Sequence, residues 1–187
     1  MTTFVYYAAT TANGFIADEG DSLAWLFEVQ GADPNALSDF LTGVGVQVMG
    51  STTYRWLVEH ENVAEDPRKW GALFGNVPTR VFSTRQLVLP HGADIDVVSG
   101  PVSGHVDDLV RVAGGSDVWI VGGGELAGQF LDAGWLDRIE LDVAPVFLRA
   151  GAPLLPRVVS STRMHLVSAE ARGPFAHVVY ELNPDVR

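Results

Sequence analysis

Three consecutive glycines between an apolar segment and an amphipathic one constrain the fold of this chain more than any other feature. Residues 118–121 are typical of a buried parallel strand, and Leu126, Phe130 and Leu131 recur at helical spacing. The glycines at 122–124 permit a sharp turn and the close approach of a ligand, because no Cβ stands in the way. A helix that begins there directs free backbone N–H groups at the turn. The stretch therefore predicts either a bare strand-to-helix turn or a cradle for a phosphate group.

Composition excludes several classes of function. The 187 residues suit one domain, residues 1–187, with a proper core. No cysteine is present, which rules out disulfides, thiolate catalysis and cysteine-bound zinc, and the five histidines lack metal-ligand spacing. With 23 acidic and 12 basic residues, the net charge of −11 opposes a nucleic-acid partner. Neither a basic leader nor a run of about 18 apolar residues occurs, so we expect a cytoplasmic protein without a membrane span.

Strands and helices are predicted to alternate through the middle of the chain. Strands are expected at 4–9, 46–49, 79–83, 95–99, 118–121 and 138–143, the last with one wet face. Helices are expected from Asp33-Pro34, after residues 50–53, at 106–112 and after the glycines, whereas 10–21 and 60–78 are interpreted as a loop and a polar connection. Residues 164–171 and 175–182 are typical of an antiparallel hairpin. The pattern predicts an α/β fold with a mostly parallel sheet.

Three of the predicted strands end in turns that suit a nucleotide. Gly50 and Ser51 follow the second strand, residues 83–85 follow the third, and the glycines at 122–124 follow a later one. In open α/β sheets ligands bind at the carboxyl ends of the strands. The three turns together favour the phosphate cradle over the bare turn.

The order of these motifs resembles that of a known family. The matching segments are residues 11–18, 48–54, 81–85, 121–124 and 136–141 with the Pro145 loop. Over nearly the whole chain they resemble the dihydrofolate reductase fold, and more closely the reductase domain of the riboflavin-pathway deaminase–reductases and its stand-alone relatives. The resemblance implies a three-layer α/β fold with helices on both faces of a mixed, mostly parallel sheet and a C-terminal antiparallel hairpin.

The same resemblance implies an NADPH-dependent reductase, a homodimer that passes hydride to a small planar heterocycle such as an aminouracil riboflavin precursor, a pterin or a flavin-like compound. The glycine turn would hold the pyrophosphate, with a cis peptide between Gly122 and Gly123, and the loop after the first strand would close over the nicotinamide. The residues implied for the cofactor are Ala9, Thr10, Ile16, Ala17, Gly50, Ser51, Thr52, Thr53, Ser83, Thr84, Arg85, Val121, Gly122, Gly123, Gly124, Glu125 and Leu126.

Departures from the family pattern bear on the cofactor and the substrate. Ser51 stands where the family carries a basic residue for the 2′-phosphate, so Arg85 would substitute for it, or NADH would serve. Gly122 and Asn13 replace the Glu and Asp of the riboflavin-pathway enzymes, which favours the stand-alone branch. Asn13 and Trp25 are the candidate substrate-binding residues. Asp18 or an ordered water would donate the proton.

Two alternatives stay open at this point. An authentic dihydrofolate reductase would need an arginine for the glutamate tail of its substrate, and Arg68 or Arg80 would have to serve. A nucleotide-binding or dimerisation module without turnover would explain both the missing basic residue after Gly50 and the missing carboxylate on the first helix. Turnover of dihydrofolate, or cofactor binding without oxidation, separates these alternatives from the first interpretation.

Overall fold

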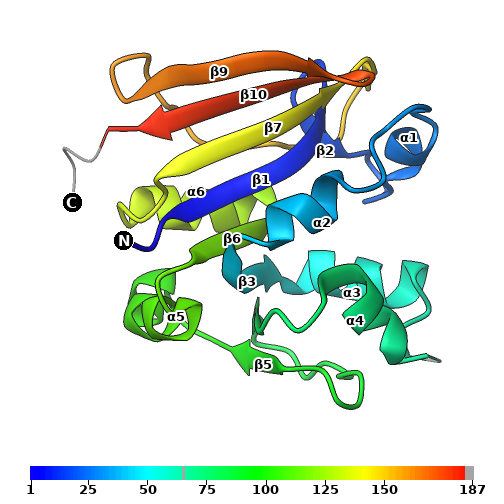
Figure 1. Cartoon of the computed structure of the whole chain (residues 1–187), viewed down its shortest axis with the longest axis vertical. Coiled ribbons are helices and arrows are strands. Elements are labelled where there is room, and N and C mark those ends of the chain that lie inside the picture. Colours follow the sequence, from blue (N-terminus) through cyan, green and yellow to red (C-terminus); the bar gives the residue numbers. More distant parts are fainter. Residues whose placement is uncertain (65, 184–187) are drawn as a thin grey trace.

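One eight-stranded sheet forms the frame of the protein. The computed structural model describes residues 1–64 and 66–183. In Figure 1 the sheet runs from β5 at the bottom to β9 at the top, in the order β5-β4-β3-β6-β1-β7-β10-β9. Its strands are β1 (Phe4–Thr11), β3 (Val44–Gly50), β4 (Thr79–Phe82), β5 (Ile95–Val98), β6 (Asp117–Gly122), β7 (Arg138–Ala144), β9 (Met164–Arg172) and β10 (Phe175–Leu182).

The predicted mixed sheet is confirmed. In the order of the sheet, the six strands β5, β4, β3, β6, β1 and β7 pair in parallel with their neighbours. The hairpin of β9 and β10 adds two antiparallel strands beside β7, at one edge of the sheet. β1 lies between β6 and β7, and its residues alternate between the two faces. Phe4 and Tyr6 belong to the core on one face, and Val5 and Tyr7 to the core on the other. Both faces of the central strands are therefore covered, as continuous apolar runs require.

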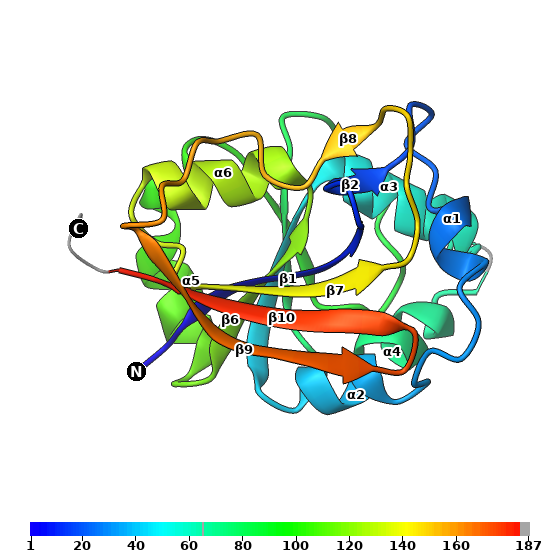
Figure 2. The ribbon, with the colours of Figure 1, turned by 90° about the horizontal axis from the view of Figure 1, so that it is seen from above.

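Helices form the outer layers on both faces of the sheet. On one face α5 and α6 bury Leu109 and Phe130 in the first core, and on the other α3 and α4 bury Tyr54 and Trp70 in the second core. Figure 2 shows α6 and α2 on opposite sides of the strands. The helices are α1 (Ala24–Phe27), α2 (Ala36–Leu41), α3 (Ser51–His60), α4 (Arg68–Phe74), the 3-10 turn η1 (Val102–Gly104), α5 (Val106–Ala113) and α6 (Gly124–Asp132).

Two predicted element boundaries in the first half were wrong. The helix expected from Asp33 begins at Ala36, because the Asp33 carboxylate accepts the N–H of Asn35 at 2.9 Å and holds a turn there. The polar connection at 60–78 contains α4, whose Trp70 and Phe74 are 2% and 3% exposed. The charged residues that precede Trp70 conceal the apolar helix face in the sequence.

The loop predicted at residues 10–21 also contains regular structure. β1 continues to Thr11, and β2 (Phe15–Ala17) pairs antiparallel with β8 (Ala152–Pro153) in a separate two-stranded sheet. The backbone N–H of Leu154 donates to the carbonyl of Gly14 at 2.9 Å, which extends this contact. The segment after the first strand is therefore fastened to the segment after β7.

The wet face predicted for β7 is wrong, because the polar side chains of this strand are largely covered. The side chains of Arg138, Glu140 and Asp142 are only 29%, 15% and 13% exposed. Arg138 pairs with Glu140 at 2.7 Å and with Asp117 at 3.0 Å, so these charges are satisfied within the protein. Apolar and polar residues do alternate along β7 as predicted, but the polar side of the strand is covered by other parts of the protein.

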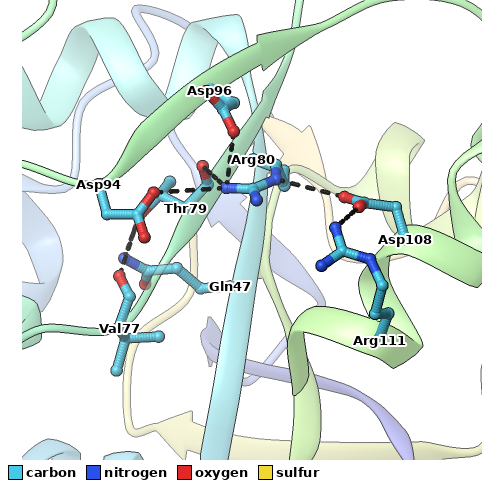
Figure 3. Close-up of polar contacts among 8 residues, drawn as sticks. All are labelled: Gln47, Val77, Thr79, Arg80, Asp94, Asp96, Asp108 and Arg111. Atoms are coloured by element: carbon cyan, nitrogen blue, oxygen red, sulfur yellow. Dashed lines mark hydrogen bonds and ion pairs between the residues drawn. The ribbon is translucent and has the colours of Figure 1, made fainter. Parts of the chain in front are cut away.

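One arginine holds the far edge of the sheet together. Arg80, at the start of β4, lies among three carboxylates: Asp94 at 3.7 Å, Asp96 at 3.2 Å and Asp108 of α5 at 3.6 Å (Figure 3). Its side chain is 11% exposed. Arg111 also binds Asp108, and together with the charge of Arg80 it lowers the pKa of that carboxyl. The cluster ties β4, β5 and α5 to one cation.

Replacing Arg80 with alanine is expected to lower the free energy of unfolding by about 2 kcal/mol, because three neighbouring carboxylates lose their shared cation. The estimate lies below that for a fully buried pair, since those carboxylates are 42–65% exposed. Urea denaturation measures the change. Arg111→Ala is the matched control and is expected to cost less than about 1 kcal/mol, because Arg111 is 71% exposed. Equal losses in the two variants would contradict the central role of Arg80.

Two further observations concern membranes and metals. Within residues 1–64 and 66–183, no helix is long and apolar enough to cross a membrane. The same described residues contain no group of three or more His, Asp or Glu side chains arranged to hold a metal ion.

Candidate active site

The three predicted strand-end turns line one cavity of about 1020 Å³ at the carboxyl ends of the parallel strands. β3 delivers Gly50, β4 leads into residues 83–85, and β6 leads into residues 121–126. Ala9, Ile16 and Ala17 from β1 and β2 also line the cavity. Of the residues implied for the cofactor, the lining lacks Thr10, which is buried and donates its hydroxyl to the Phe15 carbonyl at 3.1 Å.

Two helices begin at this cavity without a side-chain cap. The N-cap of α3 is Gly50 and that of α6 is Gly123, and no side chain caps the N–H groups of either helix. The hydroxyls of residues 51–53 therefore lie inside the helix and do not cap it. Free N–H groups and the positive ends of two helix dipoles meet at one cavity. This arrangement suits an anionic group with more than one phosphate.

The three glycines of the turn differ in what surrounds them. Gly122 has a φ of +152°, which favours glycine, and its peptide bond to Gly123 is cis, as the resemblance implies. A Cβ on Gly124 would lie 2.4 Å from the Leu154 carbonyl oxygen, so this glycine serves the packing of the protein itself. A Cβ on Gly123 would have only Ile16 near it, at 3.9 Å. Gly123 is thus the member of the turn with free space around it.

The first loop contains the candidate substrate residue Asn13 and the candidate proton donor Asp18, and both have structural partners. Asn13 donates to the Leu148 carbonyl at 2.6 Å and accepts the Leu148 N–H at 3.2 Å, on the exposed side of the loop. The Asp18 carboxylate accepts the N–H groups of Gly20 and Ser22 at 2.8 and 2.9 Å. Neither residue lines the cavity. Asn13 and Asp18 stabilise the turns that position Ile16 and Ala17.

Aromatic side chains form one wall of the cavity. Phe27 and Trp56 line it and stack at 6.1 Å with their rings 9° apart, and His60 stacks on Trp56 at 4.4 Å. Trp25 does not line it and is buried in a third cluster with Phe175. The resemblance favoured Trp25 as the aromatic residue of the site, whereas the structure places Phe27 and Trp56 at the cavity.

The lining of the cavity includes a carboxylate that sequence reasoning missed. Asp142 of β7 lines the cavity beside Tyr7, whose hydroxyl donates to Asp142 Oδ2. The Nδ1 atom of His177 lies 2.8 Å from Asp142 Oδ1. Burial, and then the hydrogen bond to Asp142, raises the pKa of Tyr7. The alternation of β7 placed Asp142 on a polar face, and only the pairing of three strands reveals its partners.

The charged residues that line the cavity differ in whether they already form an ion pair within the protein. Arg85 and Arg55 line it, are exposed, and form no ion pair with any described residue. Glu125 also lines it, but its carboxylate binds Arg157 at 2.9 Å, and this contact lowers the pKa of Glu125. Glu125 therefore offers its backbone N–H to the cavity, whereas the two arginines offer their side chains. Arg55 was missed because it lies one helical turn beyond Ser51.

Neither arginine considered for a glutamate tail lines the cavity. Arg68 is exposed and binds Asp66 at 2.8 Å. Arg80 is committed to the carboxylate cluster of Figure 3. The residues named for the folate alternative are thus engaged elsewhere.

The sheet order and the cavity across its carboxyl ends define a protein of the dihydrofolate reductase-like class. The model of the RibD C-terminal domain family matches residues 3–178, so the chain belongs to that family. Family and fold together support a reductase of this type.

Individual relatives agree with this assignment. The chain is 27% identical to the uncharacterised protein YwjB of Bacillus subtilis over 176 residues, which are 94% of this chain and 95% of the relative. A candidate riboflavin biosynthesis protein of Shewanella sp. PV-4 matches the fold with a TM-score of 0.77 at 22% identity, over 97% of this chain and 99% of that one. A dihydrofolate reductase of Enterococcus faecalis, solved with NADP(H), matches the fold with a TM-score of 0.59 at 16% identity. The match covers 97% of this chain and 96% of that one. These two structures share the fold.

Proposed function

We propose that residues 1–187 form a single-domain, NADPH-dependent reductase that transfers a hydride to a small planar heterocycle. The observation that carries this proposal is the convergence of two uncapped helix N-termini and three strand-end turns on one cavity. Membership of the RibD C-terminal domain family supports it. An aminouracil, a pterin or a flavin-like compound is the proposed class of substrate.

Each part of the cavity has a proposed task. The N–H groups at the starts of α3 and α6 would hold the phosphates of NADPH. Ile16 and Ala17, fastened through β2 and β8, would cover the nicotinamide and exclude water. NADPH bound there supplies the hydride. Trp56 and Phe27 would hold and orient the acceptor ring for hydride transfer.

We assign selectivity between NADPH and NADH to Arg85, whose side chain is exposed at the cavity. Arg85→Ala is expected to raise the Kd of NADPH by at least about tenfold, because a hydrogen bond to a charged group contributes about 1.5–3 kcal/mol. The Kd of NADH is expected to stay the same, since NADH has no 2′-phosphate. Fluorescence titration of both cofactors measures the change, with Arg68→Ala as the control outside the cavity. Equal weakening of NADPH and NADH by Arg85→Ala would contradict the assignment, and equal binding of both by the unmodified protein would favour NADH as a cofactor.

The oxidation of NADPH at 340 nm tests the reaction itself. Aminouracils, pterins, flavins and dihydrofolate form the panel of acceptors. Turnover of one of the first three classes supports the proposal, and turnover of dihydrofolate alone would identify a dihydrofolate reductase. Tight binding of NADPH without oxidation by any acceptor would identify a non-catalytic nucleotide-binding module.

We also propose that this reductase acts as a homodimer in the cytoplasm. The edge strand β9 is exposed along most of its length, including Leu166 and Val167, which are 55% and 52% exposed. An apolar, unpaired edge favours contact with a second chain. Light scattering of the purified protein distinguishes a dimer from a monomer.

A further inference from the structure

Three nearly parallel rings meet at the edge of the cavity, and two of them line it. Phe27 at the end of α1 and Trp56 of α3 line the cavity, whereas His60 at the end of α3 does not. The ring centroid of His60 lies 4.4 Å from that of Trp56 and 5.0 Å from that of Phe27. The centroids of Phe27 and Trp56 are 6.1 Å apart, and no two of the three planes differ by more than 14°. These values are typical of offset stacking.

The three distances determine how the rings are layered. Stacked rings lie in planes about 3.5 Å apart, so Phe27 and Trp56 would be about 7 Å apart if His60 lay between them. Their observed separation of 6.1 Å is shorter than that. Phe27 and Trp56 therefore lie on the same side of His60, beside one another in one layer. Because His60 does not line the cavity, the face of this layer turned away from His60 is the one open to a ligand.

Phe27 and Trp56 together form an aromatic platform that is longer than one side chain. The indole of Trp56 alone covers a single ring or two fused rings. A planar system of three rings fused in line extends beyond the indole and lies over Phe27 as well. Stacking on an aromatic side chain is favourable for any flat π-system. The contribution of Phe27 to binding therefore depends on the number of fused rings in the ligand.

The side chains near Phe27 in the chain are apolar and incompletely covered. Leu23 and Leu26 line the cavity and are partly exposed, as is Leu57 beside Trp56. Phe27 itself is 58% exposed although it stacks on two other rings. Apolar surface that a cavity leaves uncovered favours an apolar part of a ligand. The ring that lies over Phe27 is thus expected to be uncharged and benzene-like.

We propose that the aromatic platform selects acceptors with three fused rings, and that His60 positions Phe27 and Trp56 in one layer. The inference rests on the proposed reduction of a planar heterocycle and names the class of that heterocycle. A flavin-like tricycle is favoured over a bicyclic pterin and over a monocyclic aminouracil, because it alone reaches both side chains of the platform. Phe27 and Trp56 determine specificity, and His60 is a positioning residue.

A series of three ligands tests this selection. Uracil, lumazine and alloxazine share one pyrimidinedione ring and contain one, two and three fused rings. Fluorescence titration measures the Kd of lumazine and of alloxazine, and displacement of alloxazine measures that of uracil. The unmodified protein is expected to bind alloxazine at least about fivefold more tightly than lumazine, the lower value for stacking one base on an aromatic side chain. Equal or weaker binding of alloxazine would overturn the proposal without any variant.

Variants then assign the preference to the platform. Phe27→Leu keeps an apolar side chain without a flat ring, and is expected to weaken alloxazine at least about fivefold and to change uracil and lumazine less than about twofold. Trp56→Leu is expected to weaken all three ligands. Phe147→Leu is the matched control and is expected to weaken none, because Phe147 is 77% exposed and does not line the cavity. Equal weakening of lumazine and alloxazine by Phe27→Leu, or weakening of neither, would overturn the proposal.

Two substitutions of His60 test its positioning role. His60→Leu removes the flat support behind the platform and is expected to weaken alloxazine about threefold, with uracil unchanged. His60→Phe supplies another flat ring and is expected to restore the affinity for alloxazine. An equal loss in the two variants, or no loss in His60→Leu, would contradict the role of His60.

Titration of the unmodified protein with NADPH separates this inference from the proposed function. Failure to bind NADPH would contradict the proposed function, whereas the preference between lumazine and alloxazine would still test the platform. Binding of NADPH without a preference for alloxazine would contradict the platform alone.

Discussion

Replacing Gly50 with aspartate is expected to weaken NADPH binding by at least about a hundredfold while leaving the protein at least as stable as before. Gly50 is the N-cap of α3 in an extended conformation, with φ −79° and ψ 161°, and the helix lacks a side-chain cap. A Cβ there would meet only the Gly122 carbonyl oxygen, at 4.0 Å. Aspartate would therefore cap the helix and raise the free energy of unfolding by about 0.5–1 kcal/mol.

The same carboxylate would occupy the proposed phosphate cradle. Like charges about 4 Å apart near a protein surface repel by about 4 kcal/mol, which exceeds the energy of a hundredfold change in Kd. Calorimetric titration with NADPH and urea denaturation measure the two effects. Gly50→Asn is the matched control, because it supplies a cap of the same size without charge and is expected to bind NADPH more tightly than Gly50→Asp. Binding of NADPH to Gly50→Asp within twofold of the unmodified protein would contradict the cradle.

Replacing Gly124 with alanine is expected to lower the free energy of unfolding by about 1–3 kcal/mol, the usual cost of overpacking. The added Cβ would lie 2.4 Å from the Leu154 carbonyl oxygen and 2.5 Å from that of Pro153. Both are backbone atoms, so the segment containing β8 has to move. Because β8 pairs with β2, the displacement would also shift Ile16 and Ala17 and weaken cofactor binding.

Gly71→Ala is the control of the same chemical kind for Gly124→Ala. Gly71 lies within α4, and a Cβ there meets no heavy atom within 4 Å. Alanine is expected to stabilise this helix by about 0.5–1 kcal/mol, because glycine loses more backbone entropy on folding. Urea denaturation of both variants is expected to give changes of opposite sign. If Gly124→Ala were as stable as the unmodified protein, the backbone at residues 153–154 would move without loss of stability, and the predicted overpacking would be wrong.

The sequence predicts the cofactor side of the cavity well because its signals are local. Gly50, the turn at 83–85 and the glycines at 122–124 each follow an apolar run, and parallel strands bring their carboxyl ends to one edge. Even so, the reason for one glycine differed from the prediction. Gly124 accommodates the backbone of Leu154, a contact across 30 positions of the chain that no local pattern reveals.

The rest of the cavity depends on contacts between distant segments, and there the prediction was poorer. Asp142 meets Tyr7 and His177 only because β7 lies between β1 and β10. Alternation along β7 showed a polar side correctly, but whether that side is wet depends on what covers it. Trp25 shows the converse: a large aromatic residue near the expected mouth of the site lies in a core cluster outside the cavity.

Thermal unfolding with millimolar NADPH or NADH tests the central claim most directly. A ligand at a hundred times its Kd stabilises the folded state by about 2.7 kcal/mol, which corresponds to a rise in Tm of about 5–10 °C for a domain of this size. We predict such a rise with NADPH, and a smaller one with NADH. If neither cofactor raises the Tm at millimolar concentration, the cavity is no nicotinamide site and the proposed reductase function is wrong.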